Sequence, residues 1–93
     1  MAKFTNLIQP LRIGPMEVKN RMGVTAMGVS LAEEDGSCGE RIIAYHREQA
    51  RGGVGLVTMG VTGVGFPRGG NQLRHIAISD DKYVPDLKRV ADT

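Results

Sequence analysis

Short apolar runs alternate with stretches of helical period along this chain. The residues Met22–Met27 and Val54–Met59 are mostly apolar, which is typical of strands that are buried on both faces. Between them, Glu40–Arg51 places apolar residues at helical spacing, and Gly52–Gly53 follows where a helix commonly ends. The pattern therefore predicts a strand, a helix and a second strand.

A second helical pattern occupies the last part of the sequence. Ser79 or Asp80 is a candidate N-cap, and Val84, Leu87 and Val90 recur at helical spacing after it. The printed sequence ends inside this pattern without a glycine or a proline. Because strands that alternate with helices are typical of a parallel α/β fold, we expect the chain to open a larger α/β enzyme.

A β-hairpin is predicted before the first of these strands. Leu11–Ile13 and Met16–Val18 both alternate apolar and polar residues, and they flank the turn dipeptide Gly14–Pro15. The hairpin would therefore precede the main fold.

Composition places the chain among ordinary globular proteins, since 41% of its residues are hydrophobic and 24% are charged. The formal charge of +2 comes from interspersed acidic and basic residues, without the basic cluster that nucleic-acid binding requires. Cys38 is the single cysteine, and no apolar run resembles a signal peptide or approaches a bilayer span. We therefore expect a cytoplasmic protein that binds neither nucleic acid nor membranes.

The glycine-rich segment from Gly60 to His75 resembles a nucleotide-binding loop at first sight. Counted from Gly63 and Gly65, the dinucleotide fingerprint needs a third glycine where Arg68 stands, and Pro67 lies where the helix should begin. The spacing favours instead a long loop at the carboxyl end of a strand, where α/β enzymes usually place their binding loops.

The remaining candidates for chemistry have simpler explanations. His46 and His75 have no Cys, Asp or Glu at metal-ligand spacing, so we expect no metal site. The acidic run Glu33–Asp35 is typical of a solvated loop, and it would raise the pKa of the thiol of Cys38 rather than activate it. The chain therefore offers no catalytic residue of its own.

Several segments, taken in order, resemble one family of flavin enzymes. Leu7–Gly14 is followed by Val18–Arg21 and then by Thr25–Met27. This order resembles the amino-terminal signature of the old yellow enzyme family of NADH:flavin oxidoreductases, in which such a hairpin leads into the first barrel strand. Three further segments fall where the family has its first helix, second strand and second helix start: Gly39–His46, Ala50–Leu56 and Ile78–Asp81.

The resemblance implies a TIM (β/α)8 barrel of about 250 residues. Residues 1–93 would be the N-terminal part of that barrel, a hairpin followed by the first two βα units. It also implies FMN as cofactor, NADH or NADPH as reductant, and hydride delivery to a small molecule such as an activated enoyl or dienoyl alkene. The pair Glu33–Glu34 resembles the 2,4-dienoyl-CoA reductase-like branch, whose members often add a [4Fe-4S] cluster and further nucleotide-binding domains.

By the same resemblance, four residues lie against the flavin: Ala26, Met27 and Gly28 after the first strand, and Gly60 after the second. Many family members have proline where Ala26 stands and threonine or cysteine where Gly28 stands, so contact at Gly28 would be through the backbone alone. We expect position 60 to accept alanine and nothing larger, because the ring would occupy the side-chain volume. The family's residues for substrate, proton and FMN phosphate have no counterpart in this sequence.

An alternative interpretation keeps the fold and removes the activity. Two βα units leave much of a parallel sheet uncovered, so stable independent folding is not expected. The chain would then be a short structural or interaction module that is completed by the missing remainder of a barrel or by homo-oligomerisation.

Overall fold

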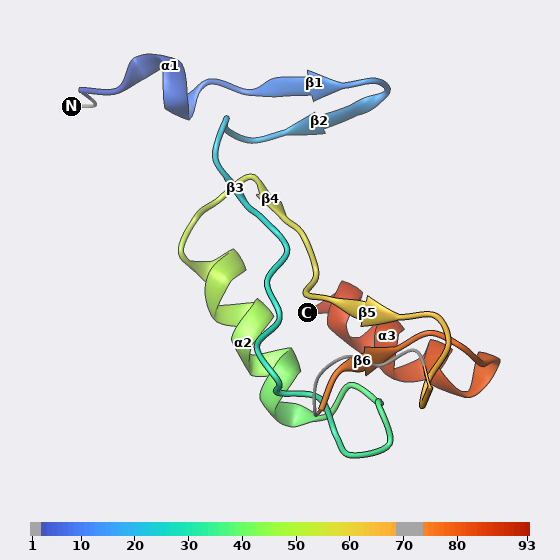
Figure 1. Ribbon diagram of the computed structural model, residues 1–93. Helices are drawn as coiled ribbons and strands as arrows, with labels where there is room; N and C mark the ends of the chain where they lie inside the picture. Colours follow the sequence, from blue (N-terminus) through green and yellow to red (C-terminus); the bar gives the residue numbers. More distant parts are fainter. Residues whose placement is uncertain (1–2, 69–73) are drawn as a thin grey trace.

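The computed structural model of the chain describes residues 3–68 and 74–93. Figure 1 shows an elongated molecule with a β-hairpin at one end, and its extents are 48, 25 and 22 Å. The described elements are, in chain order, α1 (Thr5–Ile8), β1 (Leu11–Ile13), β2 (Met16–Val18), β3 (Gly23–Val24), α2 (Glu40–Arg51), β4 (Leu56–Val57), β5 (Thr62–Gly63), β6 (Ile76–Ala77), the 3-10 helix η1 (Asp81–Tyr83) and α3 (Val84–Asp92).

The strands β1 and β2 form the predicted hairpin with the predicted bounds. They pair antiparallel, with Leu11 opposite Val18 and Ile13 opposite Met16. In the turn, Gly14 has a φ of +60°, a conformation that glycine adopts without steric cost.

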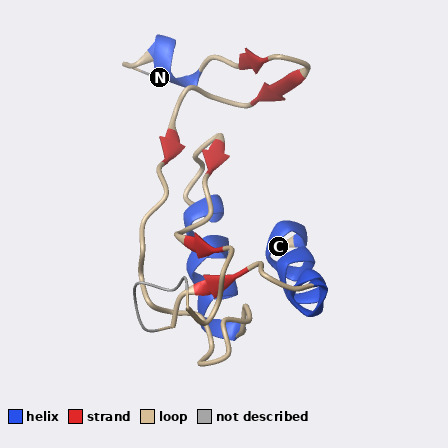
Figure 2. Cartoon of the chain, turned by 45° about the vertical axis from the view of Figure 1, so that its right-hand side comes forward, coloured by secondary structure: helices blue, strands red, loops and turns tan. Residues whose placement is uncertain are grey.

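The strands β3 and β4 pair in parallel inside the two predicted ranges, but each is only two residues long. The expected burial on both faces is wrong, since Met22, Met27 and Leu56 are 38%, 47% and 39% exposed. Figure 2 shows the strands as short separate pieces rather than one sheet. In the part of the chain that the structure describes, each strand has one neighbour and lacks the flanking layers that bury a parallel sheet.

The helix α2 has the predicted bounds, and it returns the chain from β3 to the start of β4. Its buried face consists of Ile42, Ile43 and His46. It ends at the two predicted glycines: Gly53 has a φ of +106° and donates its N–H to the carbonyl of Ala50 at 3.1 Å. This left-handed glycine just after the last turn is a common way to end a helix.

One buried asparagine joins the hairpin to the turn between α2 and β4. The side-chain amide of Asn20 donates to the carbonyl of Gly53 at 2.6 Å, and its side-chain oxygen accepts the N–H of Met22 at 3.1 Å. The backbone of Asn20 lies so close to Gly55 that a Cβ at Gly55 would be 2.6 Å from the Asn20 carbonyl oxygen. The start of β3 is therefore held directly against the start of β4.

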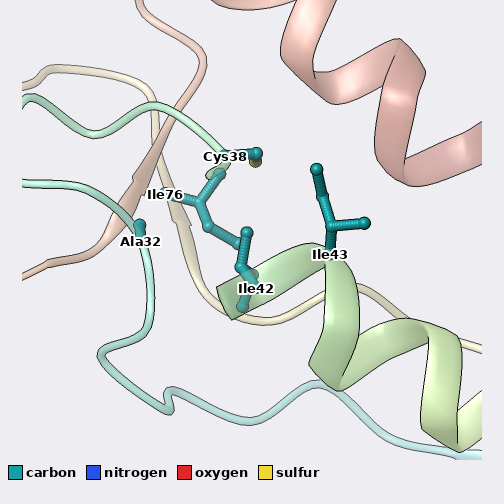
Figure 3. Close-up of a cluster of buried hydrophobic side chains, with 5 residues drawn as sticks. All are labelled: Ala32, Cys38, Ile42, Ile43 and Ile76. Carbon is teal, nitrogen blue, oxygen red and sulfur yellow. The ribbon is translucent and has the colours of Figure 1, made fainter. Parts of the chain in front are cut away.

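The apolar core is a small cluster at the N-terminal end of α2 (Figure 3). Ile42 and Ile43 project from the first turn of the helix, and Ile76 reaches the cluster from β6. The cluster consists of Ala32, Cys38, Ile42, Ile43 and Ile76, none of them more than 3% exposed. Leu87 and Val90 of α3 pack against it, which attaches the last helix to the rest of the chain.

The glycine-rich segment that the sequence predicts as a loop contains the strand β5. It pairs in parallel with β6, with Thr62 opposite Ile76 and Gly63 opposite Ala77. Sequence patterns cannot detect this pair, because strands of two residues generate no periodicity. The remainder of the segment includes residues 69–73, which lie outside the described residues.

The second helical pattern begins with a 3-10 turn. Asp80 is its cap, since the carboxylate accepts the N–H of Lys82 at 3.0 Å. One of the two predicted caps is thereby confirmed. The α-helix itself starts three residues later at Val84, with Pro85 in its first turn, where a missing N–H costs no helical hydrogen bond.

The chain is less compact than an independent domain of its length. Its radius of gyration is 15.1 Å, whereas a compact domain of 93 residues would have a value of about 12 Å. Many large apolar side chains are also exposed. These observations agree with the expectation that the two predicted units leave much of their surface uncovered.

Two glycines provide a test of the packing between the loop after β3 and β6. Gly36 has a φ of +88°, and a Cβ there would lie 2.6 Å from the Cβ of Ala77, whereas Gly53 has positive φ with nothing within 4 Å. We expect Gly53→Ala to lower the free energy of unfolding by about 1 kcal/mol and Gly36→Ala to lower it by about 1–3 kcal/mol more. Urea unfolding of a complete barrel that carries residues 1–93, followed by circular dichroism, measures both losses. Equal losses would contradict this packing.

Candidate functional site

The candidate site lies where the chain leaves the parallel strands β3 and β4. Because the strands are parallel, their carboxyl ends lie at the same edge. The chain continues from β3 to Met27 and from β4 to Gly60, and these two residues meet. A Cβ built on Gly60 would lie 2.5 Å from the carbonyl oxygen of Met27, so the two backbones are in direct contact.

The structure brings the predicted site residues to this edge but does not expose them equally. Ala26, Met27 and Gly28 are exposed, and Met27 retains 47% of its accessible surface. Gly60 is buried against Met27. The first three residues are therefore accessible to a ligand, whereas Gly60 packs against the backbone of Met27.

The expectation that position 60 accepts alanine is wrong. The atom that the new methyl group would meet is a backbone oxygen, which cannot move aside as a flexible side chain could. The close approach of the two strand ends therefore requires glycine at position 60, independently of any ligand.

Apart from the side chain of Met27, the exposed edge consists mainly of backbone groups. Ala26 contributes a methyl group and Gly28 contributes none, so a planar ligand could approach the peptide groups closely. Gly60 is buried and adds no side chain to this edge. The chemistry of this donor set fits a flat heteroaromatic ring held by backbone hydrogen bonds.

Sequence reasoning did not associate His75 with the site. His75 is 4% exposed and lines a cavity of about 10 Å³ together with Met27, Gly60 and Ile76. Its Nε2 atom has no hydrogen-bond partner among the described residues. A cavity of this size accommodates about one water molecule, and the imidazole lines it together with the two strand ends.

Two non-glycine residues beside the same cavity have left-handed backbone conformations. Ser30 has a φ of 55° and Arg74 a φ of 56°, and both line the cavity. The carbonyl of Arg74 accepts the N–H of Ala32 at 3.1 Å, which holds the loop after β3 against the segment before β6. Backbone strain of this kind costs about 1–3 kcal/mol and concentrates at functional sites. No sequence pattern signals it.

The acidic loop and the single cysteine carry no reactive group. Glu34 pairs with Arg74 at 3.1 Å, and the side-chain and backbone hydrogen bonds from Ser37 lower the pKa of Asp35. Burial raises the pKa of the Cys38 thiol to about 11, and the carboxylate of Asp86 adds to the shift. The predicted direction for Cys38 is confirmed, but its cause is burial and Asp86 rather than the acidic loop.

Two further properties concern residues 3–68 and 74–93 only. No three His, Cys, Asp or Glu side chains in these ranges converge on a point where a metal ion could bind. None of the helices in the same ranges combines the length and the apolar character that a bilayer crossing requires.

Three comparisons place this geometry among known proteins. The chain is 38% identical over 92 residues to an NADH oxidase of Thermoanaerobacter brockii, a match that covers 99% of this chain and 14% of the relative. A solved complex of 2-naphthoyl-CoA reductase with 2-naphthoyl-CoA superposes with a TM-score of 0.92 at 31% identity, over 96% of this chain and 14% of that one. The old yellow enzyme from Trypanosoma cruzi gives a TM-score of 0.82 at 25% identity, over 98% and 24%.

The chain thus spans only a small part of the length of each relative. The solved neighbours are TIM-barrel old yellow enzymes, and the α/β arrangement described here agrees with a piece of such a barrel. Residues 6–93 match the model of one family of oxidoreductases over almost the whole sequence. The chain belongs to the NADH:flavin oxidoreductase / NADH oxidase family.

Proposed function

We propose that residues 1–93 form the N-terminal part of an FMN-binding TIM barrel, namely its hairpin and its first two βα units. The support is the parallel pair β3–β4 with α2 between them in sequence, followed by α3, in a chain of this family. The small share of each relative that the chain spans agrees with this assignment.

The observation that carries the functional proposal is the contact between Met27 and Gly60. It brings the carboxyl ends of two parallel strands together and leaves Ala26, Met27 and Gly28 exposed above Gly60. In TIM-barrel enzymes the active site lies at this end of the strands. We therefore assign Ala26, Met27 and Gly28 to one edge of the flavin, and Gly60 to the floor beneath it.

When bound, FMN would supply the hydride transfer between NADH or NADPH and an acceptor. The residues of this chain would position the ring rather than react with it. Exposed backbone groups from Ala26 to Gly28 would donate or accept hydrogen bonds at the ring edge. The tight Met27–Gly60 contact would fix the depth at which the ring lies.

For the acceptor, we propose an activated alkene or a related conjugated thioester such as an enoyl or dienoyl substrate. One relative is named an NADH oxidase, which supports the reductant, and a structural neighbour is a reductase in complex with 2-naphthoyl-CoA, an aryl thioester. The dienoyl-CoA reductase-like branch, with a [4Fe-4S] cluster in the whole protein, is a further part of this proposal. The residues that would hold the acceptor belong to the rest of the barrel.

A chimera tests the function directly. Residues 1–93 would replace the matching segment of the Thermoanaerobacter brockii NADH oxidase, and the purified protein should be yellow and should bleach under anaerobic NADH or NADPH. The isolated chain should lose added FMN during gel filtration, because it provides only one edge of the ring. A folded but colourless chimera would contradict the proposal, as would a stoichiometric FMN complex of the isolated chain.

A substitution at Gly60 in the chimera tests the contact between Met27 and Gly60. We expect Gly60→Ala to lower the free energy of unfolding by about 1–3 kcal/mol and to lower the flavin content with it, because the strand ends must separate. Gly23→Ala is the matched control, since its Cβ would meet only ordinary contacts at 3.6 and 3.7 Å. Normal stability and normal flavin content in the Gly60→Ala chimera would show that the two strand ends do not form the site.

Substitutions of Gly28 in the chimera test whether this residue lies at the edge of the flavin ring. Gly28→Thr or Gly28→Cys should add a side-chain hydrogen bond to the flavin worth about 0.5–1.5 kcal/mol. If the bond favours one redox state, the two-electron potential shifts by at most about 30 mV, which a dye-equilibrated titration resolves. Gly28→Ala adds bulk without a donor and should leave the potential unchanged. An unchanged potential together with an unchanged flavin spectrum in both the Thr and the Cys variant would remove Gly28 from the ring edge.

A further inference from the structure

A small internal cavity lies at the carboxyl ends of β3 and β4. Its volume is about 10 Å³, which is about the space that one water molecule needs. Met27 and Gly60 line it from the two strand ends, and His75 lines it from the segment before β6. Most of the other lining residues are apolar, namely Val29, Leu31, Ala32, Ile42, Val61 and Ile76. The few polar groups at the cavity therefore decide what it can hold.

His75 brings one of these polar groups to the cavity. The residue is 4% exposed, and its Nε2 has no hydrogen-bond partner among the residues that the structure describes. A buried nitrogen without a partner destabilises a fold, so a ligand that pairs with it is favoured. Because Nε2 of a neutral imidazole donates in one tautomer and accepts in the other, a partner that can do both fits either tautomer. Water is such a partner.

The carbonyl oxygen of Met27 is a second polar group at the same place. A Cβ at Gly60 would lie 2.5 Å from this oxygen, so the oxygen lies directly beside the bare backbone of Gly60. Ser30 also lines the cavity and has a hydroxyl group, whereas the guanidinium of Arg74 pairs with Glu34 at 3.1 Å. An imidazole, a carbonyl and a hydroxyl group together match the three hydrogen bonds that a buried water molecule usually makes.

We propose that this cavity binds one internal water molecule, which links Nε2 of His75 to the carbonyl oxygen of Met27. The water would donate to the carbonyl and form a second hydrogen bond with the imidazole. His75 would thereby be a positioning residue, which holds Met27 and with it the exposed edge Ala26–Gly28. The water site rests on the cavity and its polar groups alone. The positioning role rests on the proposed function, because this edge would contact the flavin.

A crystal structure of the chimera with the Thermoanaerobacter brockii NADH oxidase, with and without added FMN, tests the water site. We expect an ordered water molecule within about 3.2 Å of both Nε2 of His75 and the carbonyl oxygen of Met27. A cavity without an ordered water molecule would overturn the proposal. A protein group that bonds Nε2 directly would overturn it as well.

His75→Leu in the chimera measures what the water contributes. The substitution keeps an apolar body of similar size but removes Nε2, so the water and the Met27 carbonyl lose a partner. The melting temperature without FMN should fall by about 2–4 °C, as expected for one lost hydrogen bond in a domain of this size. If Nε2 has no partner, the substitution removes an unsatisfied buried nitrogen instead. An unchanged or higher melting temperature would therefore contradict the water site, and the crystal structure decides the case if the variant fails to fold.

Two amide variants test the positioning role of His75. The amide of glutamine reaches about as far as Nε2 does, whereas that of asparagine reaches only about as far as Nδ1. His75→Leu and His75→Asn should raise the dissociation constant of the chimera for FMN about fivefold, as expected for one lost hydrogen bond, and His75→Gln should restore it. Equal losses in all variants, or no loss in any of them, would overturn the positioning role.

The outcomes separate this inference from the function on which it rests. A colourless chimera whose cavity holds the water would support the water site and contradict both the flavin site and the positioning role. A yellow chimera whose cavity holds no water would overturn this inference and leave the flavin site supported.

Discussion

The structure depends on the close approach of two backbone segments that run in parallel through β3 and β4. At one end of this pair, a side chain on Gly55 would overlap the carbonyl of Asn20, and at the other end a side chain on Gly60 would overlap the carbonyl of Met27. The hydrogen bond from Asn20 to the carbonyl of Gly53 adds a polar contact at the first end. The absence of a Cβ at both ends therefore sets the distance between the segments, and with it the register in which α2 returns the chain.

The same approach limits the side chains at the candidate site. Because Gly60 has no side chain where it meets Met27, the exposed edge consists of the Met27 side chain, the methyl group of Ala26 and backbone groups. His75 lines a cavity of about 10 Å³ beside this edge, and its Nε2 has no hydrogen-bond partner within residues 3–68 and 74–93. Ser30 and Arg74, which line the same cavity, have left-handed backbones. Exposed backbone groups beside two left-handed residues agree with the proposed role, in which this segment would position a cofactor.

The apolar contacts are distributed unevenly along the molecule. One small cluster at the start of α2 holds α2, β6 and α3 together, whereas the hairpin and the β3–β4 pair expose large apolar side chains. A radius of gyration of 15.1 Å reflects that distribution.

The sequence by itself determined the elements whose signals are local. Helical period and two glycines predicted α2 with its correct bounds, a turn dipeptide predicted the hairpin, and the order of motifs identified the family. The tertiary structure alone decided the lengths of β3 and β4, the pairing of β5 with β6, and the burial of Gly60. It also decided the cause of the shifted pKa of Cys38, which lies in the packing around the thiol and in Asp86. These features depend on which distant segments meet, and the physical reason that patterns miss them is that a two-residue strand or a missing Cβ leaves no period in the sequence.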